Sequence, residues 1–153
     1  VLYKDFLMIF FPYFIINDKR YPDQDIDDKI TRLLLEFGCD YIFLSGYMKK
    51  IESKLLNAFP NKIINTHPAI LPSIYGGKGM YGRFVHEAII NNGEKKSGVT
   101  IHYVNEVYDD GEIILTKELE ITLNETVDSL ENRIKELEKE AIIEAFEKLL
   151  AKS

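Results

Sequence analysis

The sequence predicts an α/β fold in which an open, mostly parallel sheet is flanked by helices. Short apolar runs alternate with segments whose apolar residues recur every three or four positions, which indicates alternating strands and helices. Two of these runs, Tyr41–Leu44 and Ile63–Ile64, are continuously apolar, as is typical of parallel strands. The segment between them has a helical pattern, so a right-handed crossover is expected to join two parallel strands.

Composition favours one compact domain over residues 1–153, because 46% of the residues are hydrophobic and 29% are charged. A net charge of -6 argues against a nucleic-acid or membrane surface, which needs clustered Lys and Arg. The single cysteine, Cys39, cannot form an intrachain disulfide. A reducing compartment, the cytoplasm, is therefore expected.

The chain starts at Val1, and an apolar run from Phe6 to Ile16 is broken by Pro12. The run is too short to span a bilayer, and no small-residue cleavage signal follows it. Its last part, Tyr13–Ile16, is predicted to be a buried strand. A chain that opens so near a core strand is expected to lack an upstream segment.

The first half of the chain continues with a polar, Pro22-containing connection over residues 17–25. A helix then begins at Ile26 and stops at Gly38. Its buried face is predicted to carry Ile30, Leu33, Leu34 and Phe37. The strand Tyr41–Leu44, a short amphipathic helix over Ile51–Phe59 and the strand at Ile63–Ile64 follow.

The second half begins with a helix over Tyr81–Asn92, closed by Gly93. Its inward side chains are predicted to be Phe84, Val85, Ala88 and Ile89. Half-exposed strands are predicted at Val99–Val104 and Ile113–Ile121, joined by the acidic turn Asn105–Gly111. A long helix over Thr126–Ala151 completes the chain, with an apolar stripe at Val127, Leu130, Ile134, Leu137, Ala141, Ala145 and Leu149.

The stretch Lys62–Pro72 is the centre of the functional prediction. Because side chains alternate along a strand, Asn65 and His67 project from the same face where the strand ends. Pro68 then stops the strand and forces an ordered loop. A neutral hydrogen-bond donor and a titratable base are thus expected at the carboxyl end of a strand, where open α/β sheets bind ligands.

The other titratable residues that could belong to a site could equally have a purely structural role. His86 lies mid-helix and is expected to be a surface or packing residue, and His102 is expected to be structural. No His or Cys spacing resembles a zinc site. Asp109-Asp110-Gly111 is typical of a turn, but a carboxylate there could also orient or charge the imidazole of His67 and raise its pKa.

Four blocks of the sequence resemble the phosphoribosylglycinamide formyltransferase family, and the resemblance covers roughly residues 12–150. They are Gly46–Ile51, the Asn-x-His-Pro-x-x-Leu-Pro block Asn65–Pro72, the glycine-rich loop Tyr75–Gly82, and Val104–Leu115 with Asp109. The resemblance implies a Rossmann-like sheet. It also implies transfer of a formyl group from 10-formyltetrahydrofolate to the amino group of glycinamide ribonucleotide, in purine synthesis, without a metal.

The resemblance also implies roles for individual residues. Asn65 would donate a hydrogen bond to the formyl oxygen, His67 would stabilise the tetrahedral species and move a proton, and Asp109 would hold His67 in its useful protonation state. The implied folate-binding residues are Met48, Lys49, Lys50, Ile51, Val104 and Asn105, and the implied ribonucleotide-binding residues are Gly46, Pro68 and Glu138.

The sequence also departs from the family pattern. The family begins with a strand and a Gly-rich turn that grips the ribonucleotide phosphate, and this first βα unit is expected to be missing here. Asp110 replaces a common glycine, and Lys139 stands where the family often has histidine. Two alternatives therefore stay open: a non-catalytic chain that retains the folate-binding half, and a sibling enzyme such as a formyltetrahydrofolate hydrolase.

Overall fold

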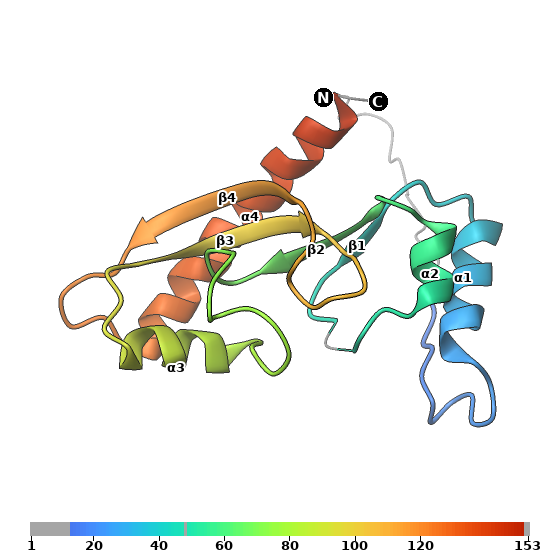
Figure 1. The fold of residues 1–153 in the computed structure, drawn as a ribbon, viewed down its shortest axis with the longest axis horizontal. Coiled ribbons are helices and arrows are strands. Elements are labelled where there is room, and N and C mark those ends of the chain that lie inside the picture. The colour runs from blue at the N-terminus through green and yellow to red at the C-terminus, as the bar shows by residue number, and fades with distance from the viewer. Residues whose placement is uncertain (1–12, 48, 152–153) are drawn as a thin grey trace, which may run out of the picture.

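A computed structural model describes residues 13–47 and 49–151. Its elements follow one another in the predicted alternation (Figure 1). In chain order they are α1 (Ile26–Glu36), β1 (Ile42–Leu44), α2 (Ser53–Ala58), β2 (Ile63–His67), α3 (Arg83–Asn91), β3 (Lys96–Tyr103), β4 (Ile113–Glu120) and α4 (Val127–Leu150).

The described strands form one open sheet in the order β1-β2-β3-β4. β1 and β2 are parallel, as the crossover through α2 predicts, whereas β2–β3 and β3–β4 are antiparallel. The open α/β sheet is confirmed, but it is mixed rather than mostly parallel. For the β3–β4 pair the reason is the connection, because the short turn before Ile113 can join only antiparallel neighbours.

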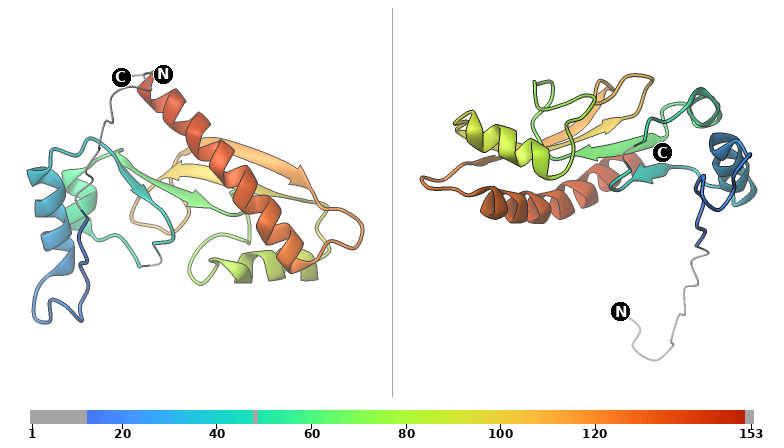
Figure 2. Two further views of the ribbon diagram at one scale, coloured as in Figure 1. Left: turned by 180° about the vertical axis from the view of Figure 1, so that it is seen from behind. Right: turned by 90° about the horizontal axis from the view of Figure 1, so that it is seen from below.

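The long helix α4 lies across one face of the sheet, behind β3 and β4 in the view of Figure 1 and in front of them in the left view of Figure 2. The predicted apolar stripe of α4 is confirmed at its buried positions, Leu130, Ile134, Ala141, Ala145 and Leu149. These side chains meet the buried residues of β2, β3 and α3 in one core cluster: Ile64, Val85, Ile89, Val99, Ile101, Leu130, Ile134, Ala141, Ala145 and Leu149.

A second, smaller core cluster lies at the β1 end of the sheet, where α1 and α2 lie side by side (Figure 1). Ile42 and Ile63 from the two parallel strands pack there with Leu55 of α2 and with Phe59, the C-cap of that helix. The helix α1 begins with Asp25, whose side chain accepts a hydrogen bond from the Asp28 N–H, and Gly38 follows its end at φ 63°.

Four local predictions are wrong. Phe37, predicted to lie on the buried face of the first helix, is 50% exposed, because it is the C-cap that follows the last helical residue of α1. Tyr13–Ile16 is not a strand, and Tyr13 is 82% exposed, because no described strand pairs with this segment. Phe84 faces outward against Tyr81, with ring centroids 5.7 Å apart. β3 is buried along most of its length rather than half-exposed, because it lies between β2 and β4 and beneath α4.

The part of the apolar run before Tyr13 lies outside the described part of the chain. Among the described residues, no helix is both long enough and apolar enough to cross a membrane.

Candidate active site

A cavity of about 660 Å³ opens at the carboxyl end of β2, between the loop after β1, the glycine-rich loop and the β3–β4 turn. All predicted site residues that the structure describes line this cavity; only Met48 lies outside the described residues. They are Gly46, Lys49, Lys50, Ile51, Asn65, His67, Pro68, Val104, Asn105, Asp109 and Glu138. Residues from distant parts of the sequence thus converge on one space.

His67 is the last residue of β2 and is buried at 3% exposure. Its Nε2 lies 2.6 Å from the carbonyl oxygen of Tyr75. Because a carbonyl can only accept, Nε2 carries the proton and donates it. In the neutral ring Nδ1 is therefore the nitrogen with a free lone pair.

Asp109 faces that free nitrogen, with its Oδ2 3.4 Å from Nδ1 of His67. The same oxygen accepts a hydrogen bond of 2.8 Å from the backbone N–H of Gly77. Asp109 has φ 55°, in the left-handed region that is typical of turns. The residue therefore forms the predicted turn and also supplies the carboxylate beside His67. The turn conformation points its carboxylate at the end of β2.

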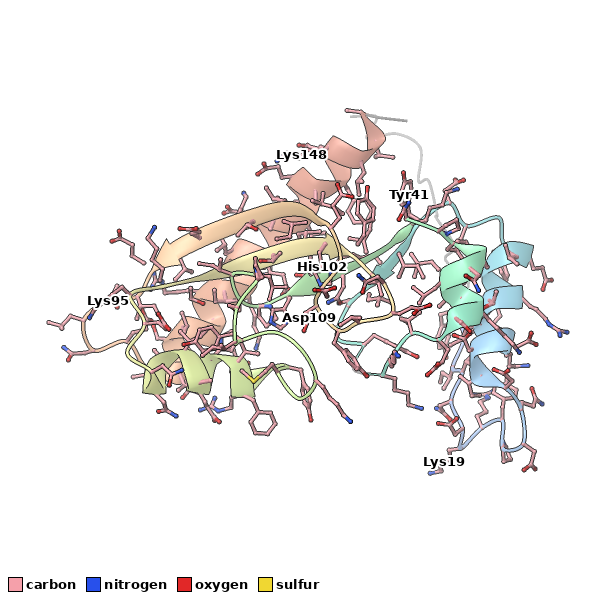
Figure 3. The ribbon with its side chains drawn as sticks, in the orientation of Figure 1. Lys19, Tyr41, Lys95, His102, Asp109 and Lys148 are labelled. Carbon is pink, nitrogen blue, oxygen red and sulfur yellow. The ribbon has the colours of Figure 1, made fainter. Side chains whose placement is uncertain are left out.

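His102, which is expected from its sequence position to be structural, also lines the cavity. The register of β2 against β3 places it opposite Asn65, and its Nε2 lies 3.2 Å from Nδ2 of Asn65. Nε2 also lies 3.5 Å from Oδ1 of Asp109, while Nδ1 lies 2.8 Å from the Tyr103 carbonyl oxygen. Figure 3 shows His102 and Asp109 next to each other. Only the strand register, which the sequence does not reveal, could have identified this contact.

The electrostatics of the cluster differ in one respect from the prediction. Burial lowers the pKa of His67, and the nearby Asp109 charge opposes that effect without overcoming it. The expected rise in the pKa of His67 is therefore wrong. For Asp109, burial acts to raise the pKa, but the hydrogen bond from His102, the charge of His67 and the Gly77 N–H together lower it. The resting pair is a neutral imidazole beside a carboxylate.

Two further side chains line the side of the cavity formed by α3 and α4. Glu138 accepts a hydrogen bond of 2.9 Å from the Thr66 hydroxyl, so it is tied to β2 and is not merely one of the exposed glutamates of α4. His86 is a packing residue and not a surface one, since it is only 3% exposed, and its Nδ1 has no hydrogen-bond partner. Burial lowers its pKa.

The arrangement suits addition to a carbonyl carbon. An amide N–H can stabilise the negative charge that develops on the carbonyl oxygen, an imidazole can accept and return a proton, and a carboxylate can stabilise the imidazolium. Within residues 13–47 and 49–151, no group of three or more His, Cys, Asp and Glu side chains could hold a metal ion.

Comparison with known proteins agrees with this geometry. A family profile described as formyl transferase matches residues 10–146. The chain is 41% identical to the chloroplastic phosphoribosylglycinamide formyltransferase of Arabidopsis thaliana over 117 residues, which are 76% of this chain and 40% of that protein. It is 36% identical to the phosphoribosylglycinamide formyltransferase of Bacillus subtilis over 128 residues, 83% of this chain and 63% of that protein.

Among solved structures, the phosphoribosylglycinamide formyltransferase of Bacillus halodurans superposes with a TM-score of 0.78 at 32% identity. The match covers 88% of this chain and 67% of that one. The chain thus spans only part of the length of its curated relatives, about 40% in the Arabidopsis case.

Proposed function

Because the chain belongs to the formyl transferase family, we propose that it transfers the formyl group of 10-formyltetrahydrofolate to the amino group of glycinamide ribonucleotide, a step of purine biosynthesis. The observation that carries this proposal is the convergence of Asn65, His67 and Asp109 on one cavity. Relatives with this activity by name support the choice of substrates.

In the proposed reaction the amine nitrogen of the acceptor forms a bond to the formyl carbon, and the carbonyl oxygen gains negative charge. A hydrogen bond from Nδ2 of Asn65 stabilises that oxygen more strongly in the transition state than in the ground state. The bond from the formyl carbon to N10 of the folate then breaks. The proton lost by the amine travels by way of Nδ1 of His67 to the leaving nitrogen.

Asp109 acts on His67 during this proton transfer. Nδ1 faces the carboxylate at 3.4 Å, so the imidazolium that forms when Nδ1 takes the proton lies beside a negative charge. The lowered pKa of Asp109 keeps the carboxylate ionised for this purpose. The Gly77 N–H holds the carboxylate in place.

The two substrates would occupy different parts of the cavity. We assign the folate to the walls formed by Lys49, Lys50 and Ile51 on one side and by Val104 and Asn105 on the other, and the family resemblance alone adds Met48 to this set. We assign the ribonucleotide to Gly46, Pro68 and Glu138. The described members of both sets line the cavity, which supports the assignment. Lys49 is held by an ion pair with Asp18, with 2.5 Å between Nζ and Oδ2.

The cytoplasm is the proposed compartment.

The test is a coupled pair of measurements on the purified chain. Release of tetrahydrofolate and formylation of the amine are followed together, with and without glycinamide ribonucleotide. The proposal expects both products in equal amount and neither product without the acceptor. Tetrahydrofolate release without the acceptor would instead identify a hydrolase.

Isothermal titration then separates an active enzyme from a chain that only binds folate. The proposal expects a reduced folate and glycinamide ribonucleotide each to bind. Binding of the folate alone, with no transfer, would overturn the proposal in favour of the non-catalytic alternative.

A further inference from the structure

Tyr75 connects the surface of the protein with the buried imidazole of His67. Its carbonyl oxygen accepts the Nε2–H of His67 at 2.6 Å, and its hydroxyl, at the other end of the residue, donates to Oε1 of Glu94 at 2.5 Å. The hydroxyl also accepts a hydrogen bond of 3.0 Å from Nδ2 of Asn92. Tyr75 is 8% exposed, so both ends of the residue are held inside the fold.

The end of α3 fixes the two side chains that hold the hydroxyl. Asn92 is the C-cap, Gly93 follows with φ 66°, and the backbone N–H groups of Gly93 and Glu94 donate to Ile90 and Ile89. This is a Schellman ending, in which a glycine in the left-handed conformation reverses the chain. It places Asn92 and Glu94 on either side of the Tyr75 hydroxyl.

The Tyr75 hydroxyl keeps its proton and so acts as a hydrogen-bond donor to Glu94. Burial and the hydrogen bond to Glu94 raise the pKa of Tyr75, so the phenol stays protonated. Its proton therefore goes to the Glu94 carboxylate, as a charge-assisted hydrogen bond.

The position of the Tyr75 carbonyl decides which nitrogen of His67 can act as a base. Asp109 lies beside Nδ1 and would attract the single proton of a neutral ring to that nitrogen. The Tyr75 carbonyl opposes this by accepting a proton from Nε2. While the carbonyl stays in place, Nδ1 is unprotonated and can accept the proton of an attacking amine.

We infer that Tyr75, held by Glu94 and Asn92, is a positioning residue that fixes the tautomer of His67 and so keeps Nδ1 available as the base. Its effect on turnover rests on the proposed function, whereas its effect on the tautomer does not. The residue acts through His67 and does not touch the cavity, since it is absent from the residues that line it.

Nitrogen NMR of the histidine side chains tests the tautomer directly, because a protonated and an unprotonated ring nitrogen have well-separated shifts. In the unsubstituted chain at about pH 8, above the ordinary histidine pKa, Nε2 of His67 is expected to be protonated and Nδ1 bare. Tyr75→Phe and Glu94→Ala are expected to move the proton partly to Nδ1. Glu94→Gln keeps an acceptor oxygen and is expected to preserve the original tautomer.

Turnover gives the second readout. Glu94→Ala is expected to lower kcat roughly tenfold, less than the about 10²- to 10⁴-fold that a proton-transferring group itself contributes, with KM for both substrates unchanged. Glu118→Ala is the matched control, since Glu118 is also an exposed glutamate whose carboxylate contacts a neighbouring side chain, Nζ of Lys96 at 2.9 Å. It is expected to change neither readout.

The tautomer and turnover measurements together show whether Tyr75 positions His67. An unchanged His67 tautomer in Tyr75→Phe and Glu94→Ala would overturn it, whatever the activity. A tautomer shift in a chain without formyl transfer would retain the positioning role and contradict the proposed function instead. Because Glu94 is exposed, Glu94→Ala is expected to fold even if Tyr75→Phe does not.

Discussion

Asp109 shows how one residue can serve both the local fold and the site. Its left-handed backbone makes the turn after β3, and its carboxylate lies between His67 and His102. An alanine here would add backbone strain to the loss of charge. Asparagine tolerates the same conformation and keeps an oxygen for the Gly77 N–H, so Asp109→Asn isolates the role of the charge.

We predict that Asp109→Asn lowers the rate of formyl transfer by about 10²-fold or more, because the imidazolium of His67 loses the carboxylate that stabilises it. The steady-state rate and the thermal melting curve are the measurements. Asp110→Asn is the matched control, since it makes the same charge change at an exposed neighbouring position. Equal rates in the two variants would remove Asp109 from the mechanism.

His86 gives a prediction about pH and stability. Its folded pKa lies below the ordinary 6.5, so the unfolded chain binds more protons than the folded chain just below pH 6.5. Stability is therefore expected to fall as the pH drops through that window. His67, whose pKa is also lowered by burial, contributes in the same direction.

His86→Leu should accordingly make the free energy of unfolding less dependent on pH between about pH 6.5 and 5. It also removes a buried Nδ1 that has no partner, so stability near pH 7 is not expected to fall for lack of a hydrogen bond. Urea denaturation at several pH values measures both effects. The same slope in the variant and the original chain would show that His86 is not held neutral by the fold.

The sequence predicted part of this residue-level picture. Strand alternation is enough to place Asn65 and His67 on one face, and the family pattern adds Asp109. The partners of these residues are not predictable in that way, because His102 reaches Asn65 through a strand register and Tyr75 reaches His67 through a backbone carbonyl. The direction of the His67 pKa also depends on burial, which the sequence does not quantify.

Among the elements, the β3–β4 turn supplies Asp109 to the site, and its tight backbone packing tolerates few substitutions. A Cβ added to Gly111 would lie 1.7 Å from the carbonyl oxygen of Tyr103, a backbone atom that cannot move aside cheaply. We therefore predict that Gly111→Ala opens the turn, displaces Asp109 and lowers both the melting temperature and the rate of formyl transfer. Loss of stability without loss of activity would show that the turn does not position the carboxylate.

The control for that substitution lies at the other end of the same hairpin. A Cβ on Gly98 would lie 2.2 Å from the carbonyl oxygen of Lys117, so Gly98→Ala should also destabilise the β3–β4 pair. It is far along the strands from Asp109. At a temperature where the variant stays folded, its turnover is expected to be near that of the original chain.

Element prediction succeeded where periodicity and stop signals agreed. The helices α1 and α4 have capping side chains at Asp25 and Thr126 and begin where the pattern predicts. Failures came where burial depends on neighbours that are distant in sequence. Tyr13–Ile16 is apolar yet has no partner strand in the described structure. The side chains of β3 are buried along most of the strand, although apolar and polar residues alternate in its sequence.

At the scale of the whole molecule, α4 joins the core to the cavity. Ile134 is 1% exposed, belongs to the larger core cluster and also lines the cavity. Ile134→Ala is therefore expected to lower the free energy of unfolding by about 2–5 kcal/mol. Chemical denaturation measures this, and a loss well below 1 kcal/mol would show that α4 is not packed against the sheet as described.

The role of Asn65 is tested most directly by single-turnover formyl transfer to glycinamide ribonucleotide by the original chain and by Asn65→Ala, at saturating 10-formyltetrahydrofolate. We expect stoichiometric transfer by the original chain. In the variant we expect an unchanged affinity for folate and a transfer rate lower by about 10²- to 10³-fold, the usual cost of removing one donor to a developing oxyanion. Equal rates in the two proteins would contradict the assignment of this cavity as the site of formyl transfer.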